Sequence, residues 1–591
     1  MILVFGGTTE GRKTAEVLEE AGKPYFYSTW GEGQHIELVH GKRLSGAMDA
    51  PAIIRFCRDN AIRLIIDAAH PFAVELHANL LCAAHRVGID VVRYERQYPP
   101  RTEDCIWCKD YQDAICRLQE HGIERLLALT GVNTIRSLRP YWETHKCWFR
   151  ILNRQGSKKL ALANQFPENY LVYYESDNTD KLIEQLQPQA ILTKESGKSG
   201  GFLGKVADAK NRHVKVFVIE RPAYPPHATF PYNVKIEIVD GPYGLRRMVE
   251  RLLPEFYTLH SGLTTGTCAT AAAVAATCRL LKNEMPTTVP VILPNGETIR
   301  VAVGHGDNYS YCIKEAGDDP DVTNGVEIRA MAGFSDSFEI KGGDGIGRFT
   351  LPGFDYAPGE AAINRVPRQM IEENVGALTH VPVSVTISVP AGAEIAKRTF
   401  NPRLGIEGGI SIIGVTGIVK PFSEEAFIDS IRKCMQVAKA SGSDFVVINS
   451  GGKSERFVRQ RYPFLPKQAF VEYGNYIGKT LEMAHELAFQ NVVLGVMLGK
   501  AVKLAEGQLD THSRKGTMNK DFINMMLAEA DCPVTTNYTL ARELWQLIPS
   551  EHIEDFCKVV LRRCMRQCQP LVPNQKLTLL LIGDDGTIHS L

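Results

Sequence analysis

The sequence predicts a multidomain α/β protein. We expect two Rossmann-like parallel-sheet subdomains in the N-terminal half, and an α+β domain followed by a Rossmann-like α/β domain in the C-terminal half. The 591-residue chain is longer than one hydrophobic core usually supports. Short apolar runs alternate with helix-length amphipathic segments, which is the pattern of parallel sheets, and glycine-containing loops follow several of these runs in both halves. The expected domains are 1–253, divided near 125, and 257–591, divided near 405.

Composition and charge exclude several classes of partner. The chain is 44% apolar and 23% charged, as is typical of soluble globular proteins. Its 67 basic and 67 acidic residues balance, so we expect no nucleic-acid or membrane-surface partner. No basic leader precedes the first apolar run, and no run approaches the roughly 18 residues of a membrane span. We therefore expect a cytoplasmic protein and leave a homo-oligomer open.

The 14 cysteines are scattered along the chain. Cys105 and Cys108 form a lone C-x-x-C, without the second pair that a zinc or iron–sulfur site needs. No metal site is therefore expected.

The first apolar run predicts a nucleotide-binding turn. A strand at 2–5 is followed by glycines and then by a helix with apolar spacing that ends at Gly22. Such a turn lets a pyrophosphate approach the helix N-terminus. Its spacing is G-G-x-x-x-G, not the usual G-x-G-x-x-G, and a turn that serves only tight packing is the alternative. The candidate cofactor-binding residues here are Gly6, Gly7, Thr8, Glu10, Gly11 and Arg12.

Three further strands, at 25–29, 64–67 and 91–96, continue the first sheet. Ser28 and Thr29 close the first of them, where an NAD-specific enzyme would carry an acid, so NADH and NADPH both remain open. His70 follows the second and is a candidate general acid, although a structural role at the start of a helix is equally plausible. Arg96 ends the third. Ser28, Thr29 and Arg96 are candidate substrate-binding residues.

Strands at 126–129, 190–194 and 214–219 predict the second sheet. Thr130 and Gly131 follow the first of these and are candidate cofactor-binding residues. Glycines and lysines after the next strand suit an anionic ligand. The candidate substrate-binding residues there are Lys194, Ser196, Gly197, Gly200, Gly201 and Lys205.

Four segments of this half together resemble precorrin-6A reductase: residues 6–12, 70–73 (His-Pro-Phe-Ala), 130–133 (Thr-Gly-Val-Asn) and 196–205. The resemblance runs through residues 1 to about 250 and implies hydride transfer from a reduced nicotinamide to a corrin precursor. Residues 94–99 depart from it, because the family often shows Arg-Pro-Pro-Trp there.

The second half begins with a Thr-Thr-Gly-Thr turn that opens an Ala-rich helix. Its hydroxyls and free backbone N–H groups are available to a ligand, so Thr264, Thr265 and Thr267 are candidate substrate-binding residues; a capped helix whose alanines pack closely is the alternative. A strand at 289–293 leads into a hairpin turn at 294–296. The aspartates of the stretch 316–325 suit a metal, but Asx turns and helix caps explain them better.

Asn364, Arg365 and Arg368 are candidate substrate-binding residues, because arginine pairs bidentately with the carboxylates of a tetrapyrrole. A solvated basic turn is the alternative. Strands are expected at 410–413, 445–449 and 492–495, with a helix from about 423. Loops at the carboxyl ends of parallel strands hold nucleosides. The candidate cofactor-binding residues are therefore Gly409, Gly414, Thr416, Gly417, Ser450 and Gly451.

Ordered blocks across about 258–590 resemble the cobalt-precorrin-5B (C-1)-methyltransferase family: residues 264–268, 318–323, 342–347, 362–368, 401–412, 474–478 and 511–513. The resemblance implies S-adenosylmethionine as methyl donor. Met497 departs from the family, where a polar residue, often His, is expected. His512 is a candidate acid or base, and a capping turn explains it equally well.

Together the two resemblances imply a bifunctional enzyme of corrin-ring (cobalamin) biosynthesis that acts on a cobalt-containing tetrapyrrole. Cobalt-precorrin-5B would be methylated at C-1, and the resulting cobalt-precorrin-6A would be reduced with NADH or NADPH to cobalt-precorrin-6B. Fusion would raise the local concentration of the intermediate. One alternative is that only one half is catalytic and the other is a degenerate tetrapyrrole-binding scaffold. An ordinary short-chain dehydrogenase is disfavoured, because the N-terminal half has no Tyr-x-x-x-Lys after its third or fourth strand.

Overall fold

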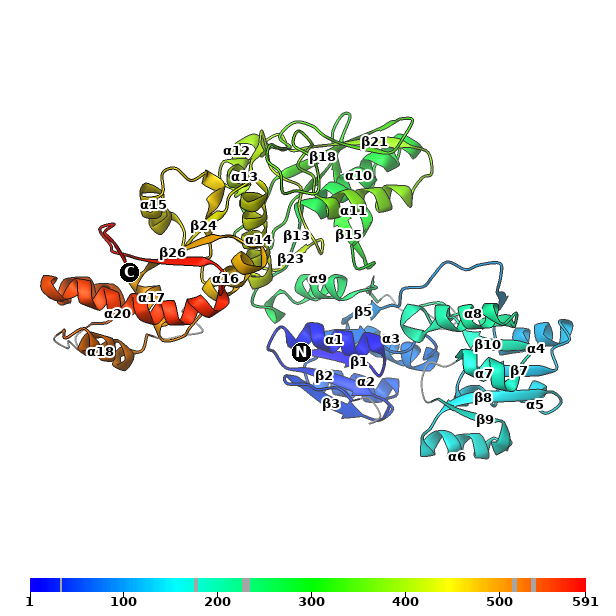
Figure 1. Ribbon diagram of the computed structural model, residues 1–591. Helices are drawn as coiled ribbons and strands as arrows, with labels where there is room; N and C mark the ends of the chain where they lie inside the picture. Colours follow the sequence, from blue (N-terminus) through cyan, green and yellow to red (C-terminus); the bar gives the residue numbers. More distant parts are fainter. Residues whose placement is uncertain (32–34, 175–178, 226–233, 513–517, 533–537) are drawn as a thin grey trace. The chain divides into compact units, whose positions relative to one another are not determined.

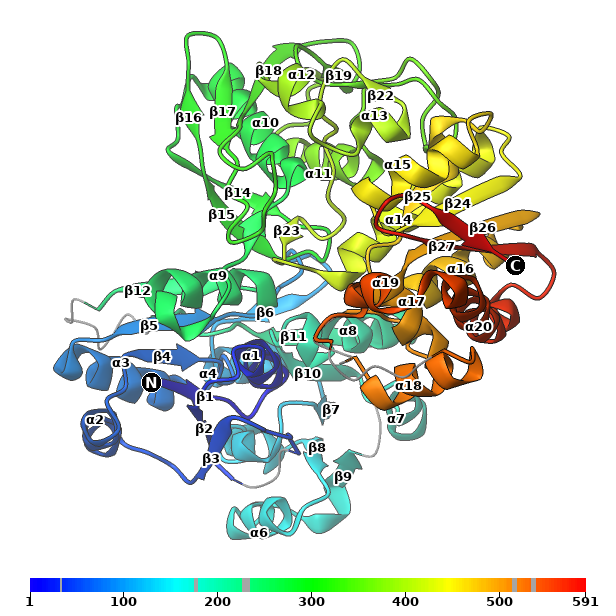
Figure 2. The same ribbon diagram turned by 90° about the vertical axis from the view of Figure 1, so that its left-hand side faces the viewer.

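The computed structural model of the chain describes residues 1–31, 35–174, 179–225, 234–512, 518–532 and 538–591. Its contacts divide the chain into two compact units (Figures 1 and 2). Unit 1 is Met1–His260 with Asn295–Ile299, and unit 2 is Ser261–Pro294 with Arg300–Leu591. No helix among the described residues is long and apolar enough to cross a membrane.

Unit 1 contains two parallel sheets. The first has the order β12-β5-β4-β1-β2-β3 and is parallel at every described pairing. Its strands are β1 (Ile2–Phe5), β2 (Tyr25–Thr29), β3 (Gly41–Ser45), β4 (Leu64–Asp67), β5 (Asp90–Tyr94) and β12 (Ile236–Val239). Its helices are α1 (Thr9–Glu19), α2 (Ala50–Asp59), α3 (Val74–Val87) and α9 (Pro242–Leu252).

Alternation along β1 explains how the helices cover this sheet. Ile2 and Val4 pack with α1 and α9, whereas Leu3 and Phe5 pack with α2 and α3. Strands that are buried on both faces read as continuous apolar runs. This is why the strands predicted at 2–5, 25–29 and 64–67 are confirmed by β1, β2 and β4.

The second sheet of unit 1 has the order β6-β11-β10-β7-β8-β9 and is also parallel. Its strands are β6 (Ile106–Cys108), β7 (Arg125–Ala128), β8 (Lys146–Leu152), β9 (Leu171–Tyr174), β10 (Ala190–Lys194) and β11 (Lys215–Ile219). Its helices are α4 (Tyr111–Glu120), α5 (Arg139–Trp142), α6 (Gln155–Ala163), α7 (Thr179–Leu186) and α8 (Phe202–Asn211). The strand predicted at 190–194 is confirmed by β10.

The chain crosses between the two sheets twice. It leaves β5 of the first sheet and joins the edge of the second as β6, and after β11 it returns to the edge of the first as β12. The boundary expected near 125 stays a prediction, and β6 at Ile106–Cys108 pairs with β11 of the second sheet. Each sheet is thus completed by a strand that is distant in sequence from its neighbours.

The first part of unit 2 is α+β. Its main sheet has the order β16-β17-β18-β21-β19, antiparallel except for β19 beside β21. The strands are β16 (Gly304–His305), β17 (Ser310–Ile313), β18 (Glu327–Phe334), β19 (Glu339–Gly342) and β21 (Val383–Ser388). α10 (Thr265–Lys282) packs against β17, β18 and α11 (Arg365–Gly376). Every residue of α10 from Thr265 to Thr277 is buried, so its alanines allow close approach on several sides.

Short elements complete this part. Two pairs of short strands are antiparallel: β13 (Gly262–Leu263) pairs with β23 (Ile418–Val419), and β20 (Arg348–Phe349) pairs with β22 (Ile406–Glu407). The predicted hairpin is β14 (Thr288–Ile292) and β15 (Thr298–Ala302). The short helices are α12 (Gly392–Ala396) and α13 (Asn401–Leu404). The boundary near 405 stays a prediction, and β22 and β23 beyond it still pair with strands of the α+β part.

The second part of unit 2 is a three-layer α/β arrangement. Its sheet has the order β25-β24-β26-β27-β28, and only the pairing of β28 with β27 is antiparallel. The strands are β24 (Phe445–Asn449), β25 (Phe470–Glu472), β26 (Asn491–Met497), β27 (Lys576–Ile582) and β28 (Ile588–Ser590). The helices are α14 (Glu424–Ala440), α15 (Gly452–Arg461), α16 (Ile477–Glu486), α17 (Leu498–Ala505), α18 (Lys520–Glu529), α19 (Leu544–Leu547) and α20 (Ser550–Cys568).

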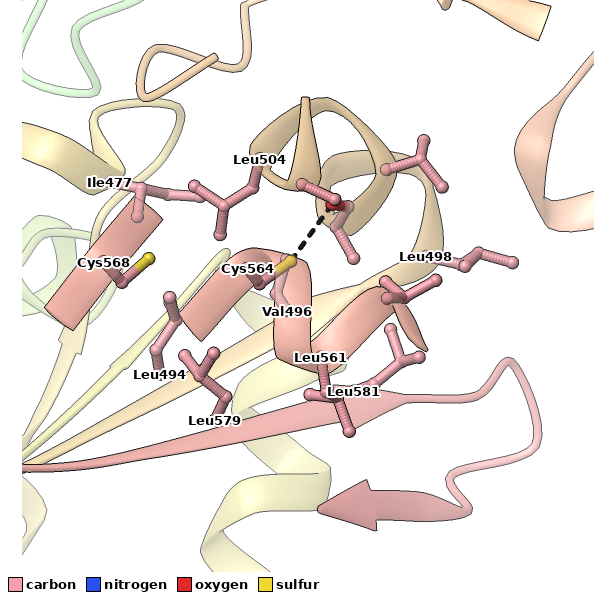
Figure 3. Close-up of a cluster of buried hydrophobic side chains, with 14 of the residues drawn as sticks. Ile477, Leu494, Val496, Leu498, Leu504, Leu561, Cys564, Cys568, Leu579 and Leu581 are labelled. Atoms are coloured by element: carbon pink, nitrogen blue, oxygen red, sulfur yellow. Dashed lines mark hydrogen bonds between the residues drawn. The ribbon is translucent and has the colours of Figure 1, made fainter. Parts of the chain in front are cut away.

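The main core of this part lies between the sheet and α20 (Figure 3). Leu494 and Val496 of β26 and Leu579 and Leu581 of β27 face α20 and α17. Cys564 of α20 donates a hydrogen bond to the Ala501 carbonyl of α17 at 3.2 Å, which ties the two helices together. The opposite face of the sheet packs against α15.

The strand predicted at 410–413 is wrong. Ile410 forms a single bridge to Ile346, and Ile412 forms a single bridge to Ile363, so the segment pairs with two different partners at alternate residues. Both isoleucines are buried, which produced the apolar pattern. The loop at 414–417 therefore does not follow a strand of the parallel sheet, although α14 begins at Glu424, as expected, with Ser423 as its cap.

Candidate functional site

The glycine turn after β1 has one open position. A Cβ on Gly6 or Gly11 would overlap the Tyr27 side chain, whereas a Cβ on Gly7 would meet no atom within 4 Å. Gly7 has a φ of +91°, which disfavours any other residue. The packing interpretation therefore accounts for Gly6 and Gly11, and Gly7 is the glycine that leaves space for a ligand. Thr8 caps α1 by accepting a hydrogen bond from the Gly11 amide at 3.0 Å.

Glu10 and Arg96, predicted to contact cofactor and substrate, contact each other. Arg96 Nε lies 3.0 Å from Glu10 Oε2, and its Nη1 donates to the Ser196 carbonyl at 2.8 Å. Ser199 donates its hydroxyl to Glu10 Oε1. The polar atoms of Glu10 are thus used within the protein, and they join the turn after β1 to the loop after β10. Arg12 is exposed on α1.

The other candidates in unit 1 fall beside one sheet or the other. Ser28 and Thr29 are buried at the end of β2, where the Ser28 carbonyl accepts from the Gly6 amide at 2.9 Å. Thr130 and Gly131 follow β7 of the second sheet, and the Thr130 hydroxyl lies 2.6 Å from that of Thr134. The cofactor candidates of unit 1 are therefore divided between the carboxyl edges of two sheets.

The loop after β10 folds onto itself. Ser196 Oγ donates to the Gly200 carbonyl at 3.2 Å, and Lys205 Nζ donates to the same carbonyl at 2.8 Å. Gly197 and Gly201 both have positive φ values, +71° and +66°. A Cβ on Gly200 would overlap Ser196, so close packing explains this glycine.

Lys194 and His70 lie close together but differ in their charge at neutral pH. Lys194 is largely buried, and its Nζ lies 5.1 Å from the centre of the Phe72 ring. Burial lowers the pKa of Lys194 to about 8. Burial, together with Arg96 and Lys194, lowers the pKa of His70 to about 3, so this imidazole stays neutral at pH 7 and is a poor general acid. His70 Nδ1 accepts from the Phe72 amide at 3.2 Å, which supports its structural role at the turn.

A buried charge network that the sequence patterns did not predict lies next to His70. Asp67 lies 2.7 Å from His77 Nδ1 and 3.0 Å from Arg93 Nη1, and all three side chains are at most 2% exposed. Burial acts to raise the pKa of Asp67, but Arg93 and His77 hold it below its usual value. The signal was available: a charged residue near the end of each of two apolar strands.

In unit 2 the Thr-Thr-Gly-Thr turn and the loop at 414–417 form one structure. Thr264 caps α10 through the Thr267 amide at 3.2 Å, and Thr267 donates its hydroxyl to the Gly417 carbonyl at 2.6 Å. Thr265 Oγ1 accepts from the Ile413 amide at 2.8 Å. A Cβ on Gly414, at φ +142°, would overlap Thr264. Contacts within the protein thus occupy many of the hydroxyl and backbone groups that were expected to be available to a ligand.

Gly409 and Thr416 also have partners within the protein. A Cβ on Gly409 would overlap the Gly345 backbone, so close approach of the two loops requires a glycine at position 409. The Thr416 hydroxyl donates to the Ile418 carbonyl at 3.0 Å.

Arg365 and Arg368 line a pocket of about 480 Å³ at the start of α11. Arg368 is oriented by donating to the Ile363 and Ala361 carbonyls at 2.9 and 3.2 Å, and its guanidinium lies 4.4 Å from the centre of the Tyr356 ring. Arg365 is exposed and has no hydrogen bond or ion pair among the described residues. Beside them, the side-chain oxygen of Asn364 is buried and accepts no hydrogen bond. The other lining residues are Phe338, Ile340, Asp355, Tyr356, Gln369 and Glu372.

The carboxyl edge of the parallel sheet in unit 2 carries a second glycine turn. The Asn449 side chain accepts from the Gly451 amide at 2.9 Å, and Ser450 Oγ lies 2.9 Å from Ser454 Oγ. Gly452 starts α15, and a Cβ there would meet no atom within 4 Å. Lys500 lies in the first turn of α17, just after β26, and burial lowers its pKa to about 8.

His512 lies at the end of a described segment, and its neighbour Ser513 is outside the described residues. Its amide donates to Asp510 Oδ1 at 3.1 Å, and Thr511 donates its amide to the Asn475 carbonyl at 3.0 Å. A turn therefore explains this segment at the backbone level. Met497 is the N-cap residue of α17.

The acidic stretch at 316–325 forms an Asx turn. Asp321 Oδ1 accepts from the Thr323 amide and hydroxyl, both at 2.7 Å, and its Oδ2 pairs with Lys314 at 2.7 Å. Within the described part of the chain, no group of three or more His, Cys, Asp or Glu could hold a metal ion.

Two protein families match the chain. Residues 1–237 match the family described as precorrin-6x reductase CbiJ/CobK, and residues 254–421 match the family CbiD.

Curated relatives cover the second half. A cobalt-precorrin-5B C(1)-methyltransferase of Prosthecochloris aestuarii is 41% identical over 352 residues, which are 56% of this chain and 95% of that protein. One from Thermus thermophilus is 39% identical over 55% of this chain and 91% of its own length. Among solved structures, a CobK precorrin-6A reductase is 19% identical, with a TM-score of 0.35, over 43% of this chain and 97% of its own.

Proposed function

Because this chain belongs to the cobalt-precorrin-5B C(1)-methyltransferase family and joins that enzyme to a precorrin reductase of the CbiJ/CobK family, we propose where its two reactions take place. It is a bifunctional enzyme of cobalamin biosynthesis, an S-adenosylmethionine-dependent methyltransferase and a nicotinamide-dependent reductase of corrin precursors. Methylation of cobalt-precorrin-5B at C-1 gives cobalt-precorrin-6A, and reduction of that product gives cobalt-precorrin-6B.

The proposed cofactor sites rest on a glycine turn that both units contain. Gly7 and Gly452 each follow a central strand of a parallel sheet, each lie at the start of a helix, and each leave open space where a Cβ would point. A glycine turn of this kind admits a phosphate or a nucleoside to the carboxyl edge of the sheet. The nicotinamide nucleotide is assigned to the turn at 6–12, and S-adenosylmethionine to the turn at 450–452.

The methyl donor is therefore not assigned to the loop at 414–417. That loop does not follow a strand of the parallel sheet, and Thr264 and Thr267 occupy its inner face. Ser450 and Gly451 remain donor-binding candidates by their position at this edge of the sheet. Their amides donate to Ser454 Oγ and Asn449 Oδ1, and the Ser450 hydroxyl is shared with Ser454.

Arg365 and Arg368 are assigned to the carboxylates of the tetrapyrrole in the methyltransferase. The pocket that they line combines one oriented guanidinium with one that has no partner among the described residues. In the reductase, Lys194 is assigned to a substrate carboxylate, because a buried ammonium gains most from an opposite charge.

Neither reaction needs a protein nucleophile. The donor supplies an electrophilic methyl group on a sulfonium, and the reduced nicotinamide supplies a hydride. The chain binds the reactants, excludes water and holds them at near-attack distance, which can supply about 7–11 kcal/mol of a barrier. His70 stays neutral in this mechanism and His512 has no assigned step.

We further propose that the chain acts without a nucleic-acid partner, as its balanced charge suggests, and in the cytoplasm, where its scattered cysteines would stay reduced. Either NADH or NADPH is compatible with Ser28 and Thr29 at the end of β2. Reduction rates with each coenzyme at equal concentration would decide between them.

Gly452→Leu tests the donor site. The leucine would project into open space at the first turn of α15 and needs no strained backbone. We expect binding of S-adenosylmethionine and C-1 methylation to be lost, while reduction of supplied cobalt-precorrin-6A is unchanged. Mass detection of each product after incubation with cobalt-precorrin-5B, the donor and a nicotinamide gives both readouts. If Gly452→Leu binds the donor normally, the proposed donor site is wrong. If the wild-type chain shows only one of the two activities, the other half is a tetrapyrrole-binding scaffold without catalytic activity.

A further inference from the structure

Glu472 ends β25, the strand beside β24, and its carboxylate lies against the glycine turn that follows β24. A Cβ on Gly451 would overlap Glu472 Oε1, so the carboxylate rests directly on the backbone of this turn. Register pairs Asn449 at the end of β24 with Glu472 at the end of β25. The acid and the turn therefore meet at the same edge of the sheet.

The carboxylate of Glu472 is unusual in having few partners. Its side chain is 28% exposed, and its nearest cation, Arg403, is 4.0 Å away. No hydrogen bond to its oxygens is present among the described residues. The neighbouring Glu455 differs: it accepts from Arg403 at 2.8 Å and from Arg459 at 2.9 Å. Arg403 is thus held mainly by Glu455, and Glu472 keeps its acceptor capacity.

The chemistry of this edge matches a nucleoside. In sheets of this kind, an acid about 20 residues beyond the glycine turn accepts hydrogen bonds from ribose hydroxyls. Glu472 stands 21 residues after Gly451 and 20 after Gly452. Burial raises the pKa of Glu472, and hydroxyl donors would offset that cost by hydrogen bonding to the ionised form.

We propose that Glu472 is the residue that recognises the ribose hydroxyls of S-adenosylmethionine, with its carboxylate accepting from one or both of them. This rests on the proposed donor site at 450–452. The residues matched by the two families, 1–237 and 254–421, do not include Glu472.

Calorimetry with S-adenosylhomocysteine, the stable demethylated product, tests the proposal without catalysis. Glu472→Ala should raise its dissociation constant about 10- to 150-fold, the range for a hydrogen bond to a charged group. Analogues that lack the 2′- or the 3′-hydroxyl should bind the wild-type chain more weakly, and at least one should lose no further affinity on Glu472→Ala. Such non-additivity identifies a direct contact.

Three controls keep the test sharp. Glu486→Ala removes an exposed glutamate of α16, paired only with Arg432 among the described residues, and should leave affinity unchanged. Glu472→Gln keeps the shape and should bind more weakly than wild type. Unfolding curves and cobalt-precorrin-6A reduction by the same samples report folding.

The outcomes separate this inference from the one on which it rests. If Glu472→Ala is folded and binds the ligand as wild type does, the inference is overturned, while Gly452→Leu still tests the donor site. If loss of either ribose hydroxyl weakens ligand binding to Glu472→Ala as much as to wild type, another residue binds the ribose hydroxyls. If Glu472→Ala does not fold, the result for Glu472→Gln with the deoxy analogues decides in the same way.

Discussion

Glu10 and Arg96 form a buried ion pair at 3.0 Å, with 7% and 6% of their side chains exposed. Glu10 lies in the first turn of α1, and Arg96 lies in the connection that crosses from the first sheet of unit 1 to the second. The same guanidinium donates to the Ser196 carbonyl at 2.8 Å. One side chain thereby links the proposed nicotinamide turn to the loop that follows β10.

Arg96→Ala should destabilise unit 1 by about 3–5 kcal/mol, because it leaves the Glu10 carboxylate buried without its cation. Glu10→Gln should cost less, since an amide can still accept from Arg96. Denaturant unfolding of both variants and of the double variant measures the coupling free energy. Additive losses would show that the pair is not an energetic unit.

Gly7→Val should abolish nicotinamide binding and reduction and leave C-1 methylation within a few-fold of wild type. The side chain would enter the open space above the turn, and the φ of +91° would add backbone strain. Gly6→Ala is the contrasting variant, because its methyl group would overlap Tyr27 and disturb packing first. Fluorescence titration with the coenzyme and both product assays give the readouts; equal loss of both activities in Gly7→Val would argue against two separate sites.

Gly414→Val should lower the stability of unit 2 and leave the donor affinity of the folded protein unchanged. Strain at the positive φ costs about 1–3 kcal/mol, and disturbance of the Thr264 cap costs about 1 kcal/mol more. Val415→Ala, in the same loop at a side chain that is 70% exposed, is the matched control and should be nearly neutral. Thermal unfolding measures the stability and calorimetry measures the donor affinity. A stable Gly414→Val variant with weakened donor binding would contradict this prediction.

Arg365→Ala should raise the Michaelis constant for cobalt-precorrin-5B roughly 10- to 150-fold and leave that for S-adenosylmethionine near wild type. Arg368→Ala should do the same and also lower stability, because its guanidinium holds the Ile363 and Ala361 carbonyls.

The effect of Arg365→Ala should shrink as salt rises, because screening already weakens an exposed pair. Kinetics at two ionic strengths measure this, with Arg398→Ala as an exposed arginine control. A loss confined to the methyl donor would place Arg365 in the donor site instead.

Strands buried on both faces could be predicted from the sequence, because their apolar runs do not depend on distant partners. The segment at 410–413 shows the limit of that argument. Ile410 and Ile412 have the spacing of a strand, but they bridge to two different loops that lie far away in sequence. Pairing partners decide whether an extended segment becomes a strand.

The glycines show a second limit. Gly6, Gly7 and Gly11 are alike in sequence, and only the position of Tyr27 on the neighbouring strand separates the two that pack from the one that is open. Glu472 illustrates the converse. Its spacing from Gly451 can be read from the sequence, but only the fold shows that its carboxylate accepts no hydrogen bond from the residues that the structure describes.

The alkaline pH dependence of reduction should report Lys194. In the free protein its pKa is about 8, so the ammonium is lost above that pH and with it the attraction for a substrate carboxylate. The ratio kcat/KM for cobalt-precorrin-6A should therefore fall above about pH 8, since this ratio reports groups of the free enzyme. Lys194→Arg, which keeps its charge, should move this fall to higher pH, and Lys194→Met should give a low value with no such fall.

Protein stability provides an independent check with a defined sign. Because the folded pKa of Lys194 lies below the unfolded value of about 10.5, the unfolded chain binds more protons between the two. The free energy of unfolding contributed by this residue should accordingly rise with pH from about 8 to 10.5, and the difference between wild type and Lys194→Met should follow that rise. A wild-type kcat/KM profile that is flat to pH 10, or a Lys194→Met variant with an unaltered alkaline fall, would show that another group controls substrate binding in the reductase.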